Sequence, residues 1–135
     1  MKFHYILLAI FLQTTVFATE YAVVVYKDFQ TKQFSKKQIK DIFMLKRQFI
    51  NGIKILPVNL ASSALPREVF EKKILKINRD RLNSYWVRKH FQGIRPPVVQ
   101  KSSKAMKLFV KNVKGAIGYL PIEAVDVDLR VVYEF

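Results

Sequence analysis

The chain has 135 residues, which suits one domain and is too short for two, and its 50% hydrophobic and 13% aromatic content favours a packed core over global disorder. Cysteine is absent, which excludes disulfides, thiol catalysis, thiolate zinc sites and a lipid-anchored cysteine. Lys and Arg number 24 against 10 Asp and Glu, and this net charge of +14 favours anionic partners without indicating a fold.

Residues 1–18 are typical of a secretory signal peptide. Lys2 gives a positive start, an apolar run follows over residues 5–12, and Val16 and Ala18 provide the small side chains expected before a cleavage point. The run is shorter than the roughly 20 apolar residues that a membrane-spanning helix needs. We therefore expect cleavage after Ala18 and a soluble periplasmic or secreted protein without stable membrane insertion, whose 23 basic and 10 acidic residues give a charge of +13.

Residues 19–135 are expected to form a single domain in which strands and helices alternate. The β-branched run at 21–26 predicts a largely buried strand. Ser35, with Gln38 three residues later, forms a capping-box pattern that predicts a helix over 36–47. No internal repeat, low-complexity tract or long linker interrupts the sequence.

The middle of the chain is predicted to continue with a turn and a second strand. Asn51-Gly52 is a turn signal, and residues 53–59 alternate as a strand does. Pro57 removes one ladder donor and therefore indicates a strand end or an edge.

Three further helices are each preceded by capping residues, and glycine ends the last two. The helices and their caps are 64–77 after Ser62 and Ser63, 81–91 after Asn78 or Asp80, and 104–113 after Ser102 or Ser103. Short strands are expected at 98–99, 116–120 and 130–133. This alternation predicts an α/β fold with a mostly parallel or mixed sheet flanked by helices, in which ligands bind at the carboxyl ends of strands beside helix amino termini.

Four segments, in order and at similar spacing, resemble the phosphate-type periplasmic substrate-binding proteins. They are FSKKQIKDIFMLKR at 34–47, ILPVN at 55–59, LNSYWVRKHFQG at 82–93 and KGAIGYLP at 114–121. The resemblance implies one lobe of the type 2 periplasmic binding fold. Full-length members of that family are more than twice as long and close two such lobes over an anion. It also implies periplasmic solute binding, a small inorganic oxyanion such as phosphate as ligand, and an ABC transporter, a second lobe or another copy as partner.

The same resemblance places a ligand site after the second strand. In the family an arginine ends this strand and a Ser-Gly-Thr turn opens the next helix. Here Asn59 stands near the arginine position, and Ser62 and Ser63 supply hydroxyls without the glycine and threonine. A helix amino terminus offers free backbone N–H groups and partial positive charge to an anion. The predicted ligand residues, of which Arg67 lies one turn into the helix, are Asn59, Ser62, Ser63, Ala64 and Arg67.

Simpler interpretations of these residues stay open. Ser63 can be an ordinary helix cap, and Asn59 a turn asparagine that bonds its own backbone. Ser102 and Ser103 can cap the fourth helix or face the same crevice. Two lysine-rich clusters are either solvated helix faces or anion-binding surfaces; they comprise Lys36, Lys37, Lys40, Lys46 and Arg47, and Lys101, Lys104, Lys107, Lys111 and Lys114.

The remaining polar and aromatic residues favour no catalytic or metal chemistry. Tyr85 and Trp86 are expected in the core, and His90 near a helix end. Asp126 and Asp128 are expected to be surface charges. No nucleophile elbow, phosphate-binding glycine loop, histidine-based triad or carboxylate cluster is present in the sequence. We therefore expect a binding protein, not an enzyme, with no cofactor.

Two functions follow as hypotheses. The first is a periplasmic solute-binding lobe that holds a small oxyanion weakly or with a partner. The second is an interaction module that keeps the fold and uses its basic surface to bind an acidic protein, an envelope polymer or DNA.

Overall fold

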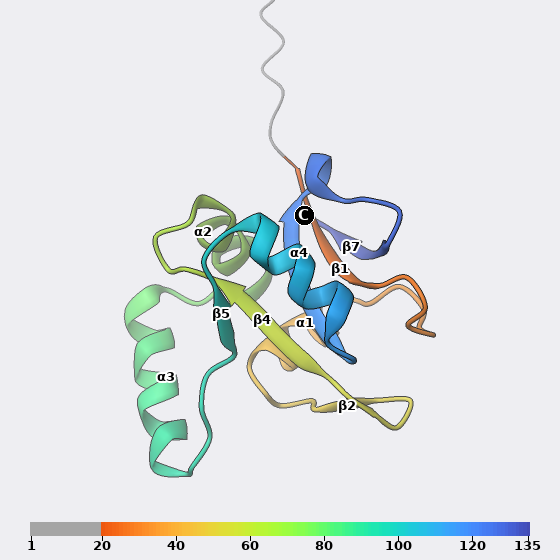
Figure 1. Ribbon diagram of the computed structural model, residues 1–135. Helices are drawn as coiled ribbons and strands as arrows, with labels where there is room; N and C mark the ends of the chain where they lie inside the picture. Colours follow the sequence, from red (N-terminus) through yellow and green to blue (C-terminus); the bar gives the residue numbers. More distant parts are fainter. Residues whose placement is uncertain (1–19) are drawn as a thin grey trace, which may run out of the picture.

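The computed structural model describes residues 20–135, so the signal peptide predicted at 1–18 lies outside the described residues. Figure 1 shows a twisted sheet with helices on both faces and one helix, α3, standing at its side. The sheet has five strands in the order β5-β4-β6-β1-β7. The mixed α/β fold predicted from the alternation of elements is therefore confirmed.

The sheet is mixed because its first strand runs against its neighbours. β1 (Tyr21–Tyr26) pairs antiparallel with both β6 (Ala116–Pro121) and β7 (Leu129–Glu134). β4 (Leu56–Leu60) pairs parallel with β6 on one side and with β5 (Val98–Gln100) on the other. Five of the six β1 residues are buried, as a β-branched run covered on both faces should be.

The strand expected at 53–59 is divided into two. β2 (Phe49–Ile50) and β3 (Ile53–Lys54) form a separate two-stranded hairpin, and the main-sheet strand β4 begins only at Leu56. Asn51 and Gly52 connect the hairpin, both with positive φ, which these two residue types tolerate best. The turn is confirmed, and the single strand is corrected.

Pro57 lies in an inner strand but at a place where its missing N–H costs little. It is opposite Ile117 of β6, whereas the pairing of β4 with β5 covers only Val58 to Leu60. One side of β4 is therefore unpaired at the proline. Pro57 marks a strand end, as the sequence predicted.

Helices cover both faces of the sheet, and β6 contacts both helix layers. Neighbouring β6 residues point to opposite faces, so Gly118 and Tyr119 pack against different helices. On one face, Gly118 leaves room for Met106 of α4 (Ser103–Asn112), whose thioether sulfur occupies the space that a Cβ would need. On the other face, Tyr119 stacks on Phe70, with ring centroids 4.3 Å apart, and lies 6.0 Å from Phe43. This aromatic cluster forms the core beneath α1 and α2.

The predicted caps of α1 and α4 are confirmed. Ser35 and Gln38 form the complete capping box of α1 (Lys36–Phe43), and Ser102 caps α4 through Ala105. α1 is four residues shorter than predicted, because Leu45 adopts a left-handed φ of 56° and ends the helical path.

The segment after β4 is irregular. α2 (Leu65–Phe70) continues directly into a π-helical turn, η1 (Glu71–Leu75), and Lys76 ends it with a φ of 52°. The predicted helix over 64–77 therefore ends at Leu75. A 3-10 turn, η2 (Ile122–Ala124), precedes β7.

α3 (Arg79–Phe91) lies at the side of the sheet rather than on one of its faces (Figure 1). Asn78 caps it, as predicted, and Leu82 is its one fully buried residue. Tyr85 and Trp86 are half-buried, so their placement in the core is corrected. The Tyr85 hydroxyl donates to the carbonyl of Met44 at 2.7 Å, which ties α3 to the end of α1.

Candidate functional site

The predicted ligand residues follow the carboxyl end of a parallel strand. β4, β5 and β6 run in the same direction, so their carboxyl ends meet at one edge of the sheet. The chain turns from β4 into α2 there, and from β5 into α4. Both helices therefore begin at the edge where α/β folds bind their ligands (Figure 1).

Asn59 is held inside the sheet by a tyrosine from β6. Its Oδ1 accepts a hydrogen bond of 3.0 Å from the Tyr119 hydroxyl, which itself accepts from the Leu60 amide at 3.2 Å. Burial raises the pKa of the Tyr119 hydroxyl well above its ordinary value, so this hydroxyl stays protonated and remains a donor. Asn59 is part of β4 and is not a turn asparagine.

Ser62 and Ser63 lie exposed in the turn between β4 and α2. Neither serine caps the helix: Ala64 occupies the N-cap position without a side-chain cap, and Pro66 lies in the first turn. The Ala64 amide closes the turn on the Ala61 carbonyl at 2.9 Å. The interpretation of Ser63 as the cap is thus wrong, and both hydroxyls project from an uncapped turn.

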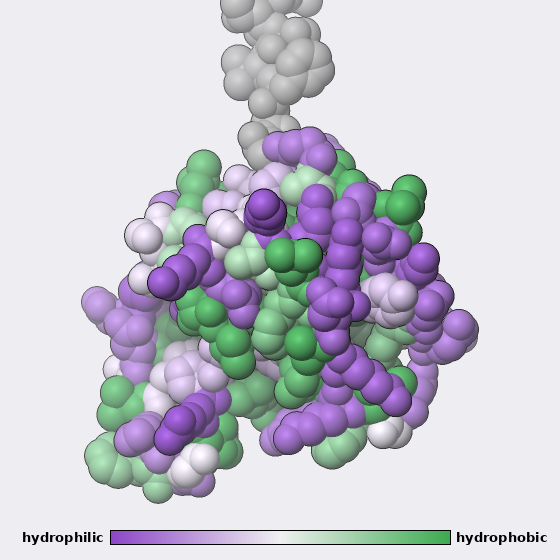
Figure 2. Space-filling model, in the orientation of Figure 1, coloured by the Kyte–Doolittle hydropathy of each residue, from purple (hydrophilic) through white to green (hydrophobic). Residues whose placement is uncertain are grey.

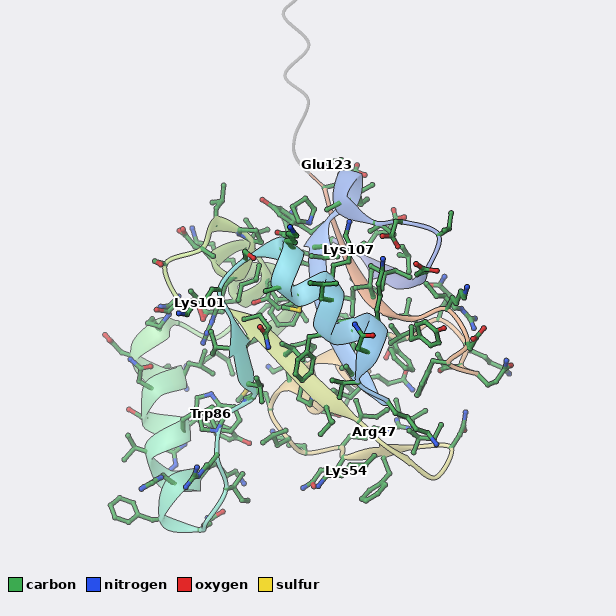
Figure 3. All side chains as sticks on the ribbon, viewed as in Figure 1. Arg47, Lys54, Trp86, Lys101, Lys107 and Glu123 are labelled. Carbon is green, nitrogen blue, oxygen red and sulfur yellow. The ribbon has the colours of Figure 1, made fainter. Side chains whose placement is uncertain are left out.

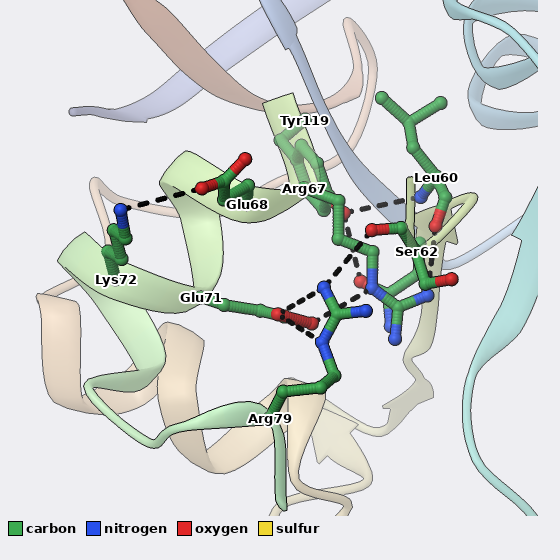
Figure 4. A network of polar contacts seen from close by, with 9 residues as sticks. Leu60, Ser62, Arg67, Glu68, Glu71, Lys72, Arg79 and Tyr119 are labelled. Carbon is green, nitrogen blue, oxygen red and sulfur yellow. Dashed lines mark hydrogen bonds and ion pairs between the residues drawn. The ribbon is translucent and has the colours of Figure 1, made fainter. Parts of the chain in front are cut away.

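Two arginines and a buried glutamate support this turn from beneath (Figure 4). Arg67 donates from Nη1 to the Leu60 carbonyl at 2.9 Å and from Nε to Glu71 at 3.2 Å. Arg79 donates to the Ser62 carbonyl at 3.1 Å and twice to Glu71, at 2.8 and 3.0 Å. The Glu71 side chain is only 8% exposed, so its charge depends on these two partners.

Glu71 and Arg79 were not among the site residues predicted from the sequence. The spacing of Arg67 and Glu71 was a usable signal, because residues four apart on a helix face each other. Two guanidiniums around one carboxylate leave one net positive charge under the turn.

The structure brings Asn59 and Arg67 together and leaves the two serines outside their pocket. Asn59 and Arg67 line a groove of about 550 Å³ that opens toward α3 and the Pro96-Pro97 segment. Ser62 and Ser63 are not part of its lining. The five predicted residues are therefore neighbours in the turn but do not line one common pocket.

The lysine row of α4 is partly neutralised. Lys111 lies 2.7 Å from Asp126 and 3.3 Å from Asp128, and Lys107 lies 3.6 Å from Asp126. The hydrogen bond to Lys111 lowers the pKa of both carboxyl groups. Asp126 and Asp128 therefore tie the segment before β7 to α4 rather than standing as separate surface charges.

Residues 20–135 contain no group of three or more His, Asp or Glu side chains that could hold a metal ion. Within the same residues, no helix combines the length and the apolar character that crossing a membrane requires.

The described fold is that of one lobe of the phosphate-type substrate-binding proteins. A phosphate transport receptor of Vibrio cholerae matches with a TM-score of 0.69 at 21% identity, over 84% of this chain and 46% of the receptor. A phosphate ABC transporter substrate-binding protein of Clostridium perfringens, solved with bound phosphate, gives 0.68 at 21%, over 84% and 45%. PstS of Borrelia burgdorferi gives 0.62 at 11%, over 84% and 47%.

The chain spans less than half the length of each of these structures, as a single lobe should. No family model matches the sequence, and no curated protein matches it. The resemblance read from the four sequence segments is therefore confirmed as a likeness of fold.

Proposed function

We propose that the chain is an exported, periplasmic solute-binding lobe that holds a small inorganic oxyanion such as phosphate at the turn between β4 and α2. One observation carries the proposal. The uncapped turn of Ser62 and Ser63 follows the carboxyl end of a parallel strand, in a fold shared with phosphate-binding receptors. The role proposed is binding rather than catalysis, as in those neighbours.

The chemistry of the turn suits an anion in three ways. The two serine residues are exposed and neither caps α2, so their hydroxyls can donate hydrogen bonds to an oxyanion. Arg67 and Arg79 hold the turn carbonyls of Leu60 and Ser62, which keeps these acceptors away from the anion. The surplus positive charge of the Arg-Glu-Arg group adds long-range attraction.

A single lobe should bind such an anion weakly. A two-lobed receptor with a micromolar Kd gains about 8.2 kcal/mol, and half of that energy corresponds to a millimolar Kd. A closed cleft also excludes water, which strengthens every charged hydrogen bond. We therefore propose that tight binding needs a partner, namely a second lobe, another copy of the chain or an ABC transporter.

Thermal unfolding in the presence of phosphate tests the proposal. With a millimolar Kd, about 50 mM phosphate should stabilise the protein by roughly 2 kcal/mol, which is a rise in Tm of several degrees. Chloride at equal ionic strength should not. Replacing both turn serines, Ser62→Ala with Ser63→Ala, should abolish the shift, while Ser84→Ala on α3 should preserve it. The proposal fails if phosphate, sulfate and arsenate all leave Tm unchanged.

A second function, an interaction module with a basic surface, is favoured by one specific observation. No acidic residue occurs among the 42 residues from Arg81 to Ile122, which contain nine lysines and arginines. This stretch contains most of α3 and all of β5, α4 and β6, so the excess charge is concentrated on connected elements. Binding to an acidic protein, an envelope polymer or DNA through this surface should weaken steeply as salt rises.

A further inference from the structure

The groove that Asn59 and Arg67 line extends between α3 and the edge strand β5 and does not include Ser62 or Ser63. It has a volume of about 550 Å³, within the range of known ligand pockets. Its walls are mainly apolar: Trp86, Val87 and Phe91 come from α3, and Pro97 and Val99 from the opposite side. Figure 3 shows Trp86 projecting from α3 toward the segment that leads into β5.

The rim of this groove exposes large apolar side chains. Phe91 is 85% exposed and Val87 56%, on consecutive turns of the same helix. Val99 of β5, which lines the groove, is 50% exposed. Figure 2 shows hydrophobic surface on both sides of the notch beside α3, at the lower left. Exposed apolar groups gathered around a hollow mark an interaction surface, whereas single scattered ones do not.

One side of the groove is formed by β5, an edge strand of the sheet. β5 stands at the end of the strand order and pairs only with β4 among the described residues. The outer backbone groups of an edge strand can form a ladder with another extended chain. A polypeptide can thus combine main-chain bonds to β5 with side-chain contacts in the groove, which is the usual geometry of β-strand addition.

The charge around the groove selects the partner. Arg67 lines the groove itself. On the elements that form its walls, Arg88 and Lys89 belong to α3, Arg95 precedes the proline pair, and Lys101 follows β5 directly. The latter four belong to the acid-free stretch from Arg81 to Ile122. The buried Glu71 carboxylate is paired with Arg67, which lines the groove, and with Arg79. The partner that complements this rim is acidic.

We propose that this groove receives an extended, acidic polypeptide segment that adds to β5 as a strand and inserts an apolar side chain between Trp86 and the proline pair. A polypeptide fits better than a nucleic acid, because the free edge strand offers a backbone ladder and the walls are aliphatic as well as aromatic. This inference rests on the second proposed function, the interaction module, and gives it one binding site and one class of partner. It does not depend on anion binding at the turn between β4 and α2.

Peptide selection on the purified chain tests the inference. A random linear peptide library should yield binders that carry net negative charge and alternate apolar residues. A selected peptide, synthesised with a fluorescent label, should bind roughly tenfold more weakly to the double variant Val87→Ser with Phe91→Ser. The control Leu108→Ser removes an apolar residue of α4 that is exposed to about the same degree as Val87, and this variant should bind normally. Lys101→Glu should weaken binding, and Lys32→Glu, far along the sequence in the loop after β1, should not.

Amide hydrogen exchange and binding by further variants separate the possible outcomes. On binding, amide hydrogen exchange of Val98–Gln100 should slow, because a new ladder protects β5. The variant with both Ser62→Ala and Ser63→Ala should bind the peptide normally, so failure of the anion site and failure of the groove are distinguishable. The inference is overturned if no peptide is enriched, or if the groove variants bind the selected peptide as tightly as the native chain does. It is also overturned if the groove substitutions weaken binding of an oligonucleotide but not binding of any peptide.

Discussion

The most constrained residue near the turn is Glu71. Its carboxylate is almost fully buried and is shared by Arg67, four residues earlier, and Arg79, eight residues later. A buried charge of this kind is tolerated only when its partners satisfy it, and here each partner also donates to a carbonyl of the turn. Glu71 therefore determines the position of two guanidiniums and, through them, the shape of the turn between β4 and α2.

Replacing this charge should cost more stability than replacing a surface charge on the same helical segment. Glu71→Gln leaves both guanidiniums without their anion, and we expect a loss of about 3 kcal/mol. Glu68→Gln is the matched control, since Glu68 pairs at 3.4 Å with an exposed lysine and should change stability by less than about 0.5 kcal/mol. Urea unfolding of both variants measures the difference. Equal losses would show that the Arg-Glu-Arg group does not support the fold.

At the scale of elements, the sequence predicted what local chemistry determines. The caps at Ser35, Asn78 and Ser102 were readable because their partners lie three residues away. The same locality explains the turn at Asn51-Gly52. The division of the 53–59 strand was not readable, because its first two residues pair with β2 while the rest joins β6 and β5.

The candidate site was readable only in part for the same reason. Asn59 was identified by its place at the end of a predicted strand, where the resembling family has an arginine, and Arg67 by its place one turn into the next helix. The partner of Asn59, Tyr119, lies 60 residues away, and no sequence periodicity links the two. The π-helical turn is equally hidden, since it depends on the Lys76 amide reaching the Glu71 carbonyl five residues back, at 2.7 Å.

The cap of α4 gives a prediction at this scale. Ser102 and Ser103 are adjacent, but only Ser102 accepts from a helical amide, that of Ala105 at 3.0 Å. Ser102→Ala should therefore destabilise the protein by about 1 kcal/mol, and Ser103→Ala by less than about 0.5 kcal/mol. Thermal unfolding of the two single variants decides between them. A larger loss of stability in Ser103→Ala than in Ser102→Ala would contradict the assignment of Ser102 as the cap.

At the scale of the whole molecule, charge links parts of the chain that are distant in sequence. Lys111 of α4 contacts Asp126 and Asp128, which precede β7, and Asp128 also pairs with Lys27, just after β1, at 3.3 Å. The group joins a helix on one face of the sheet to the neighbouring strands β1 and β7. It also consumes part of the positive charge of α4, so the uncompensated charge lies closer to α3 and β5.

This group should give the protein a defined pH range of added stability. Its hydrogen bonds hold the pKa of Asp126 and Asp128 below their ordinary values and the pKa of Lys111 above its own. A lowered carboxyl pKa adds stability above about pH 4 that is lost as the pH falls through the folded-state value. A raised lysine pKa adds stability that is complete below about pH 10 and is lost at higher pH. The contribution of the group should thus be constant between these limits and fall at both ends.

Lys111→Met should remove this contribution without emptying the space that the lysine stem fills. We expect the variant to be less stable than the native chain at neutral pH and low salt, and the difference to shrink as the pH is lowered below about 4. Lys104→Met is the control, because Lys104 lies exposed on the same helix and forms no ion pair with residues 20–135. Urea midpoints measured from about pH 3 to pH 7 test the expectation. A constant difference between Lys111→Met and the native chain across this range would mean that the ion pairs contribute nothing and that the lysine acts only through packing.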